Sequence, residues 1–274
     1  LLYLISFFKK KYIWEVHTKV QGRIGLLVAR RAYRVVAISQ SIKDHFVTQG
    51  IPAHKICVAH DGVDLADFSL QESKEALRTD LEIPKDRFIV GYVGKLSAMG
   101  EGKGVAGIME AFAAVNQKHS QALLMLVGIN SDERAWAQKL LERFNISEGA
   151  CLLVEHVPHS EVPKYLGVSD ILVMNYAKRA DNFYSPLKLF EYMASGVPIV
   201  TSDVANIREV LTDTEAEFVS ADDPESLSRG IEKMMQNPQK AQDIGRNARQ
   251  KVLHYSWKKR AENIVVFAGQ EYGT

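Results

Sequence analysis

Short apolar runs alternate with helix-like amphipathic segments along most of this 274-residue chain. The runs at 87–94, 122–128 and 171–176 are apolar nearly throughout rather than at every second position. Such continuous runs are typical of parallel strands that helices cover on both faces. Because short connections join the runs to the helical segments, the pattern predicts an α/β fold with a right-handed, doubly wound parallel sheet.

The same reading predicts the following strands and helices. Expected strands lie at 11–17, 35–39, 55–60, 87–94, 122–128, 151–156, 171–176, 198–202 and 217–220. Expected helices lie at 21–34, 41–49, 105–116, 132–144, 160–167, 186–195, 206–211, 224–236 and 239–270, the last with an interruption near 255–257. The polar stretch from 63 to 87 contains Pro84 and is the best candidate for a linker.

The charge of the chain is nearly balanced but unevenly placed. A net charge of +1 gives no general case for nucleic-acid binding. Residues 1–34 nevertheless carry eight basic residues and one acidic residue, and their helix 21–34 is amphipathic and basic. Peripheral contact with an anionic membrane or an anionic substrate is one interpretation, and a solvated basic face is the other.

Two cysteines, Cys57 and Cys151, both lie in apolar runs. Their number and spacing fit neither a zinc site nor a disulfide framework, so we expect core thiols in a reducing, cytoplasmic compartment. The opening LLYLISFF is too short to span a bilayer and precedes its lysines, unlike a signal peptide. The absence of an initiator methionine suggests a truncated chain.

The stretch YSPLKLFEYMASGVPIV, 184–200, predicts a helix whose N-terminus can bind an anion. Ser185 is a good N-cap and Pro186 suits the first helical position. Lys188 in the first turn opposes the helix dipole unless an anion is bound there. Glu191 lies at the border of the apolar stripe formed by Leu187, Phe190, Met193 and Ala194. An ordinary capped helix with a Lys188–Glu191 ion pair is the alternative.

Two further groups follow predicted strands. Gly94 and Lys95 end the strand 87–94, and a glycine-rich loop with Lys103 leads into the next helix. Glycines let a ligand approach the backbone closely, and two lysines would attract an anion, although a surface loop has the same composition. His17 ends the first strand, where a structural role is the commoner one. In doubly wound sheets these strand ends face the ligand.

Taken in order, the segments resemble the retaining GT-B glycosyltransferases of the family 4 type, also called glycosyl transferases group 1. The resemblance rests on EVHT, VVAISQSIKDHF, KICVAHDGVD, GYVGKL, GKGV, LLMLVG, VPKYLGVSDILVMNY, SPLKLFEYMASGVPIVTSD and YSW. It implies a complete C-terminal Rossmann-like domain preceded by the last part of an N-terminal one. The implied ranges are 1–70 for the N-terminal remainder, 71–86 for the linker, 87–254 for the nucleotide-sugar domain and 255–274 for a helix crossing back.

The resemblance also implies a reaction and its residues. A sugar would pass from a nucleotide diphosphate sugar to an unidentified acceptor hydroxyl with retention of configuration, without cofactor or metal, in cell-envelope polysaccharide biosynthesis. Implied catalytic residues are His17, Lys95 and Lys103. Implied donor-binding residues are Gly94, Lys95, Lys103, Ser185, Pro186, Leu187, Lys188 and Glu191.

The chain departs from the family pattern at identifiable positions. Phe183 stands where the first acid of the family's glutamate pair is expected, with Asp181 nearby, and Asp61 replaces the usual asparagine of the NGVD turn. Only the last third or so of an N-terminal domain is expected. A non-catalytic nucleotide-sugar-binding fragment, or an epimerase or phosphorylase of the same fold, therefore stays open.

Overall fold

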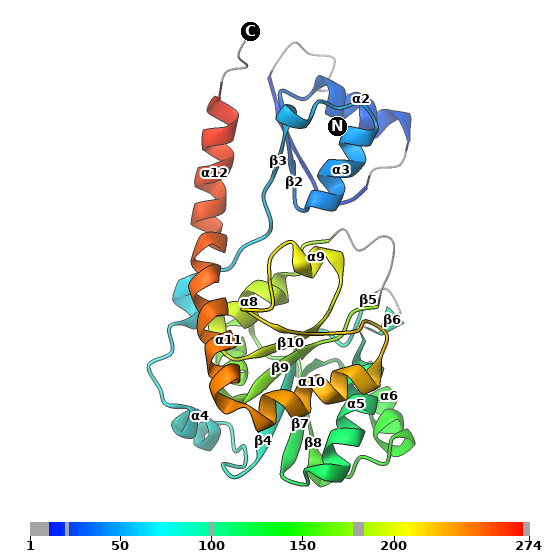
Figure 1. Ribbon diagram of the computed structural model, residues 1–274, viewed down its shortest axis with the longest axis vertical. Coiled ribbons are helices and arrows are strands. Elements are labelled where there is room, and N and C mark those ends of the chain that lie inside the picture. Colours follow the sequence, from blue (N-terminus) through cyan, green and yellow to red (C-terminus); the bar gives the residue numbers. More distant parts are fainter. Residues whose placement is uncertain (1–10, 20–21, 99–100, 103, 178–183, 271–274) are drawn as a thin grey trace. The chain divides into compact units, whose positions relative to one another are not determined.

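The computed structural model describes residues 11–19, 22–98, 101–102, 104–177 and 184–270. The chain divides into two compact units. Unit 1 comprises residues 1–63, 179–187 and 254–274, and unit 2 comprises residues 64–178 and 188–253. Both are α/β structures, and each is described by itself (Figure 1).

Unit 1 contains a small parallel sheet in the order β1-β2-β3. Its strands are β1 (Ile13–Val16), β2 (Arg34–Ala37) and β3 (Ile56–Val58), and its helices are α2 (Arg23–Arg31), α3 (Gln40–Thr48) and α12 (Trp257–Gly269). All four residues of β2 are buried, and Ile42 and Phe46 of α3 share one core cluster with Val35 and Ala37. Because Arg34 belongs to β2, the expected helix 21–34 ends earlier than predicted.

Residues before α12 pair with the chain that leaves β3. The backbone of Val63 forms a parallel bridge with Ser256 and accepts a hydrogen bond from the Trp257 N–H. A Cβ atom on Gly62 would lie 2.7 Å from the carbonyl oxygen of Tyr255, so this close approach requires glycine. The chain therefore interrupts its C-terminal helices at 255–257 as predicted, because Tyr255 and Ser256 pair with Gly62 and Val63.

Unit 2 contains a six-stranded parallel sheet in the order β11-β10-β9-β4-β7-β8. The strands are β4 (Phe88–Val93), β7 (Ala122–Ile129), β8 (Cys151–Glu155), β9 (Ile171–Met174), β10 (Ile199–Ser202) and β11 (Glu217–Val219). Every residue of β7, β9 and β10 is buried. This burial on both faces is the reason that the runs are apolar throughout, and the predicted doubly wound sheet is confirmed.

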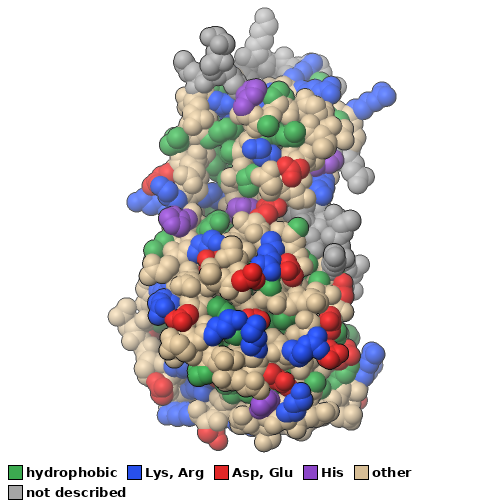
Figure 2. Space-filling model, viewed as in Figure 1, with side chains coloured by type: hydrophobic (Ala, Val, Ile, Leu, Met, Phe, Trp, Pro, Cys, Tyr) green, Lys and Arg blue, Asp and Glu red, His purple; other side chains and the backbone are tan. Residues whose placement is uncertain are grey.

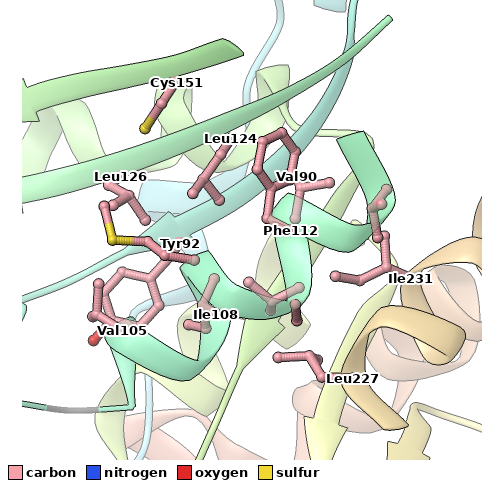
Figure 3. Close-up of a cluster of buried hydrophobic side chains, with 14 of the residues drawn as sticks. Val90, Tyr92, Val105, Ile108, Phe112, Leu124, Leu126, Cys151, Leu227 and Ile231 are labelled. Atoms are coloured by element: carbon pink, nitrogen blue, oxygen red, sulfur yellow. The ribbon is translucent and has the colours of Figure 1, made fainter. Parts of the chain in front are cut away.

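Helices surround this sheet. They are α4 (Lys74–Asp80), α5 (Val105–Lys118), α6 (Ser131–Arg143), α7 (Val162–Val168), α8 (Leu187–Ser195), α9 (Ala205–Arg208), α10 (Pro224–Gln236) and α11 (Pro238–Lys251). Side chains of α5 and α10 meet alternate residues of β4 and β7 in one apolar cluster, in which Phe112 and Ile231 lie near Val90 and Leu124 (Figure 3).

The strand order reverses between β4 and β9. From β4 the chain moves outward through β7 to β8, then returns to place β9 on the other side of β4. Ligands of doubly wound sheets bind at such a switch point, beyond the carboxyl ends of the strands. The ends of β4 and β9, with the first turn of α8, are therefore the place where a site is expected.

The stretch expected to be a linker has regular structure instead. Within 71–86, helix α4 begins after Ser73, whose hydroxyl accepts a hydrogen bond from the Ala76 N–H. Leu77 and Arg78 of this helix are buried in unit 2. A short hairpin of β5 (Ser97–Ala98) and β6 (Glu101–Gly102), which the sequence did not predict, follows β4.

Candidate functional site

Gly94 ends β4 in a conformation that favours glycine, with a φ of 142°. A Cβ atom there would lie 3.1 Å from both Cε and Nζ of Lys188, in the first turn of α8. The next residue, Lys95, is exposed. Three of the predicted donor-binding residues, Gly94, Lys95 and Lys188, thus converge at the switch point.

Tyr92 connects the backbone of this loop with the lysine of the helix. Its hydroxyl donates a hydrogen bond of 2.8 Å to the carbonyl oxygen of Lys95 and accepts one of 2.5 Å from Nζ of Lys188. The same Nζ lies 3.9 Å from the centroid of the Tyr92 ring. Burial raises the pKa of the Tyr92 phenol well above its ordinary value, so the hydroxyl keeps its proton. Sequence reasoning treated Tyr92 as part of a strand and missed this role.

Glu191 lies one turn further along α8 and contacts His159. Its Oε1 is 2.9 Å from Nε2 of His159, and its side chain is mostly buried while that of His159 is exposed. The alternative of a Lys188–Glu191 ion pair is therefore not observed: Lys188 contacts Tyr92 and Glu191 contacts His159. The sequence analysis missed His159, although it follows the end of β8 and so lies at the same edge of the sheet.

The residues before α8 differ from expectation. The helix begins at Leu187 rather than Pro186, and the Ser185 hydroxyl accepts a 3.0 Å hydrogen bond from the Asp61 N–H. Ser185 therefore holds the turn after β3 instead of capping α8. Leu187, expected in the core, is 52% exposed because it starts the helix beyond the strand ends, whereas Phe190, Met193 and Ala194 are fully buried.

Gly104 has a packing role. At a φ of 75° it precedes α5, and a Cβ atom would lie 2.0 Å from the carbonyl oxygen of Asn175 at the end of β9. Nδ2 of Asn175 donates to the Gly104 carbonyl, and its Oδ1 accepts from the Ser202 hydroxyl. This glycine thus lets the start of α5 close against β9. Lys103, Asp181 and Phe183 lie outside the described residues.

In unit 1, His17 belongs to a charged cluster. Its Nε2 lies 2.9 Å from Oε1 of Glu15, and that oxygen lies 2.9 Å from Nη2 of Arg260 on α12. Arg260 also donates through Nε to the carbonyl oxygen of His60. Burial raises the pKa of Glu15, but hydrogen bonds from Arg260 and His17 outweigh it and leave the pKa below its ordinary value. His17 itself is exposed.

A hollow of about 390 Å³ lies at the opposite edge of the unit 2 sheet. Its lining includes Arg78, Arg87 and Asp170, near the amino ends of β4 and β9. Arg78 and Arg87 both donate to main-chain carbonyl oxygens. These hydrogen bonds join neighbouring segments of the backbone, so the two arginines have a structural role. The switch point is therefore kept as the candidate site.

Charge elsewhere on unit 2 is mixed. Figure 2 shows Lys and Arg interspersed with Asp and Glu over the visible face of this unit. Among the described residues, no three His, Cys, Asp or Glu side chains are grouped so that they could hold a metal ion. The described helices include none with the length and apolar character needed to cross a bilayer.

Comparison with known proteins agrees with this architecture. The model of the family described as glycosyl transferases group 1 matches residues 73–251. The uncharacterized glycosyltransferase MJ1607 of Methanocaldococcus jannaschii is 22% identical over 93% of this chain and 68% of its own length. The capsular polysaccharide biosynthesis glycosyltransferase CapM of Staphylococcus aureus is 23% identical over 80% of this chain, which spans 56% of its length.

Solved structures share the fold. Anabaena Alr3699/HepE in complex with UDP aligns with a TM-score of 0.79 and 18% identity, covering 96% of this chain and 74% of that one. Sucrose-phosphate synthase from Thermosynechococcus elongatus aligns with a TM-score of 0.74 and 19% identity, over 96% and 68% of the two chains. The GT-B fold is therefore shown. With a family model that matches about two thirds of its length, the chain belongs to the glycosyl transferases group 1 family.

Proposed function

We propose that this chain carries the donor-binding part of a glycosyltransferase that moves a sugar from a nucleotide diphosphate sugar to an acceptor hydroxyl. The observation that carries the proposal is the convergence of Gly94, Lys95 and Lys188 at the switch point of the sheet. Family membership and the UDP complexes of Anabaena Alr3699/HepE support a nucleoside diphosphate as the ligand there.

Lys95 and Lys188 would bind the diphosphate. Charge builds up on this leaving group as the glycosidic bond breaks, so a fixed cation stabilises the transition state more than the ground state. The positive end of the α8 helix dipole acts in the same sense. A charge-assisted hydrogen bond contributes about 1.5–3 kcal/mol, so two lysines could supply roughly 10²–10⁴ in rate. Lys103 is proposed for the same role from its motif alone.

Glu191 would bind the nucleoside end of the donor. A mostly buried carboxylate can accept hydrogen bonds from a ribose diol, and the exposed His159 that now contacts Glu191 would turn outward. We propose that the reaction needs no metal, because the lysines and the helix dipole would neutralise the diphosphate. Retention of configuration is proposed from the family resemblance alone. A role for His17 beside the transferred sugar is proposed from its motif alone.

Calorimetric titration with UDP and with uridine tests the diphosphate assignment. Lys188→Met should weaken UDP binding at least about tenfold, the loss of one charge-assisted bond, and leave uridine binding unchanged. Lys118→Met is the matched control, because Lys118 lies in the last turn of α5 and pairs with Glu232. Equal losses for UDP and uridine, or for the two variants, would refute the assignment.

The base and the metal requirement need separate experiments. A thermal-shift panel of UDP, GDP, ADP and TDP should give one diphosphate that stabilises unit 2 well above the others. Its effect should persist in EDTA. If EDTA abolishes the stabilisation, a metal ion and not the lysines is the principal partner of the diphosphate. The anomeric configuration of the product, read by proton NMR, tests retention.

The acceptor is proposed only by class. CapM is named for the biosynthesis of a capsular polysaccharide, and the glycosyltransferase AmsK of Erwinia amylovora for that of amylovoran. We therefore propose that the acceptor is a hydroxyl of a growing cell-envelope polysaccharide, which receives the sugar on the cytoplasmic side. Incubation of a labelled nucleotide sugar with polysaccharide precursors would show the acceptor, and label released only as free sugar would contradict this class.

Helix α2 supports a peripheral membrane contact. Arg23, Arg30 and Arg31 are exposed on it, together with Ile24 at 62% exposure. Basic and apolar side chains on one exposed helix favour anionic lipid surfaces. Sedimentation with vesicles of phosphatidylglycerol, but not of phosphatidylcholine alone, is the expected result. Binding independent of lipid charge would contradict it.

A further inference from the structure

The ring of Tyr92 lies in the apolar core, and its hydroxyl lies at the carboxyl end of β4. The side chain is 1% exposed and packs in the cluster that includes Val105 and Leu126, where Figure 3 shows its ring beside the start of α5. A phenol in such a place needs hydrogen-bond partners. It finds them in the Lys95 carbonyl and the Lys188 ammonium.

The hydrogen bond between Tyr92 and Lys188 depends on Gly94, the glycine that follows β4. Cε and Nζ of Lys188 lie 3.1 Å from the position that a Cβ atom of Gly94 would occupy. Gly128 in turn lies against Gly94, since its own Cβ would be 2.8 Å from the Gly94 carbonyl oxygen. The loop is therefore shaped so that the lysine passes over the end of β4 and reaches the Tyr92 hydroxyl.

We propose that Tyr92 is a positioning residue that holds the Lys188 ammonium in place for the diphosphate of the donor. The inference rests on the proposed function and adds to it the residue that orders its cation. Lysine has four rotatable bonds, and fixing them costs about 2 kcal/mol of side-chain entropy. Because the Tyr92 hydroxyl already holds the ammonium, part of this side-chain entropy is lost before the ligand binds.

The hydroxyl can hold both partners at once. As a donor it fixes the Lys95 carbonyl, and as an acceptor it receives one of the three N–H donors of the ammonium. An ammonium so held can still direct another N–H toward a phosphate oxygen. Since burial keeps the phenol protonated, the arrangement does not change across the physiological pH range.

A double-mutant cycle with UDP separates positioning from a merely structural role. Tyr92→Phe keeps the ring in the core and removes only the hydroxyl. We expect it to weaken UDP binding about five- to tenfold, as for one lost hydrogen bond, and to leave uridine binding unchanged. In a Lys188→Met background the same change should alter the UDP dissociation constant less than about twofold. The same loss in both backgrounds would overturn the proposal.

Tyr192→Phe is the matched control. Its hydroxyl also lies at the end of β4, where it bonds the N–H and the carbonyl oxygen of Val93. The removal of this hydroxyl should lower the melting temperature and leave the UDP dissociation constant within about twofold of the parent value. If Tyr192→Phe weakens UDP as much as Tyr92→Phe, the effect comes from the strand end in general and the proposal fails.

The outcomes also separate this inference from the proposed function. A parent chain that binds no nucleoside diphosphate would contradict the proposed function. A parent that binds UDP through Lys188 but is insensitive to Tyr92→Phe would leave the proposed function standing and remove Tyr92 from it.

Discussion

Asp170→Asn should destabilise unit 2 strongly, because Asp170 is the counter-ion of a buried arginine. Its Oδ2 lies 2.8 Å from Nη2 of Arg78 and accepts a 2.6 Å bond from the Ile89 N–H, while its Oδ1 lies 2.6 Å from Nζ of Lys74. The Arg78 side chain is only 7% exposed. The carboxylate therefore joins helix α4 to the starts of β4 and β9.

The size of the loss in unfolding free energy depends on which interactions of Arg78 remain after the substitution. Removing one partner of a buried ion pair typically costs about 3–5 kcal/mol, because the other charge stays buried. Arg78 keeps its bonds to the carbonyl oxygens of Val168, Lys85 and Arg87, and asparagine can still accept from Ile89. We therefore expect the lower end of the range, about 3 kcal/mol in the free energy of unfolding.

Urea unfolding followed by tryptophan fluorescence measures this loss. The chain has three tryptophans, and only Trp136 lies in unit 2, so a Trp14→Phe, Trp257→Phe background reports on that unit. Glu225→Gln is the control, since its pair with Arg229 is exposed and should contribute less than about 0.5 kcal/mol. A loss for Asp170→Asn no larger than that of the control would refute the reasoning.

Three further changes test the electrostatics. Arg260→Met should raise the pKa of Glu15 in a carbon-13 carboxyl titration, whereas Lys259→Met beside it should not; no rise would contradict the pairing. Burial raises the pKa of Glu215, but its bonds from Lys251 and Thr212 outweigh this and lower the pKa to about 2. The stability that Glu215 adds over Glu215→Gln should therefore be complete above its unfolded pKa and disappear as pH falls from about 5 to about 2; a constant difference would contradict it. Burial raises the pKa of Cys151 to about 12, so in Cys57→Ser the thiol should react with Ellman's reagent only upon unfolding, and rapid labelling would refute this.

The sheet was predictable because its signal is local. Every residue of β7 and β9 is buried, so apolar runs alone mark these two strands. The same pattern indicates where the carboxyl ends of the strands lie, but not the switch point. The strand order itself depends on long-range pairing, which neither spacing nor composition encodes.

Helix α4 was missed although the sequence carries a signal for it. Ser73 is a capping residue, Glu75 lies in the first turn, and Leu77 is the buried anchor. The polar surroundings and Pro84 outweighed this signal and suggested a linker. Burial of Arg78 depends on Asp170, almost a hundred residues away in the chain, and so could not be anticipated.

The sequence indicated residues of the candidate site, but it did not indicate which other residues they contact. Lys95 and Lys188 were identified from their positions at a strand end and a helix start, and Glu191 from its position at the border of the apolar stripe. The partners of the last two, Tyr92 and His159, lie 96 and 32 residues away from them, and only the folded chain brings these pairs together. The predicted roles of all these residues, and those of His17 and Lys103, stay predictions.

The most direct test of the central claim is a nitrogen-15 NMR titration of the chain with UDP. The account predicts that the amide signals of Gly94, Lys95, Lys188 and Glu191 shift together and saturate with one dissociation constant, while those of Arg78 and Asp170 at the opposite sheet edge stay in place. Shifts confined to the hollow around Arg78, or no saturable shift at the ends of β4 and β9, would contradict it.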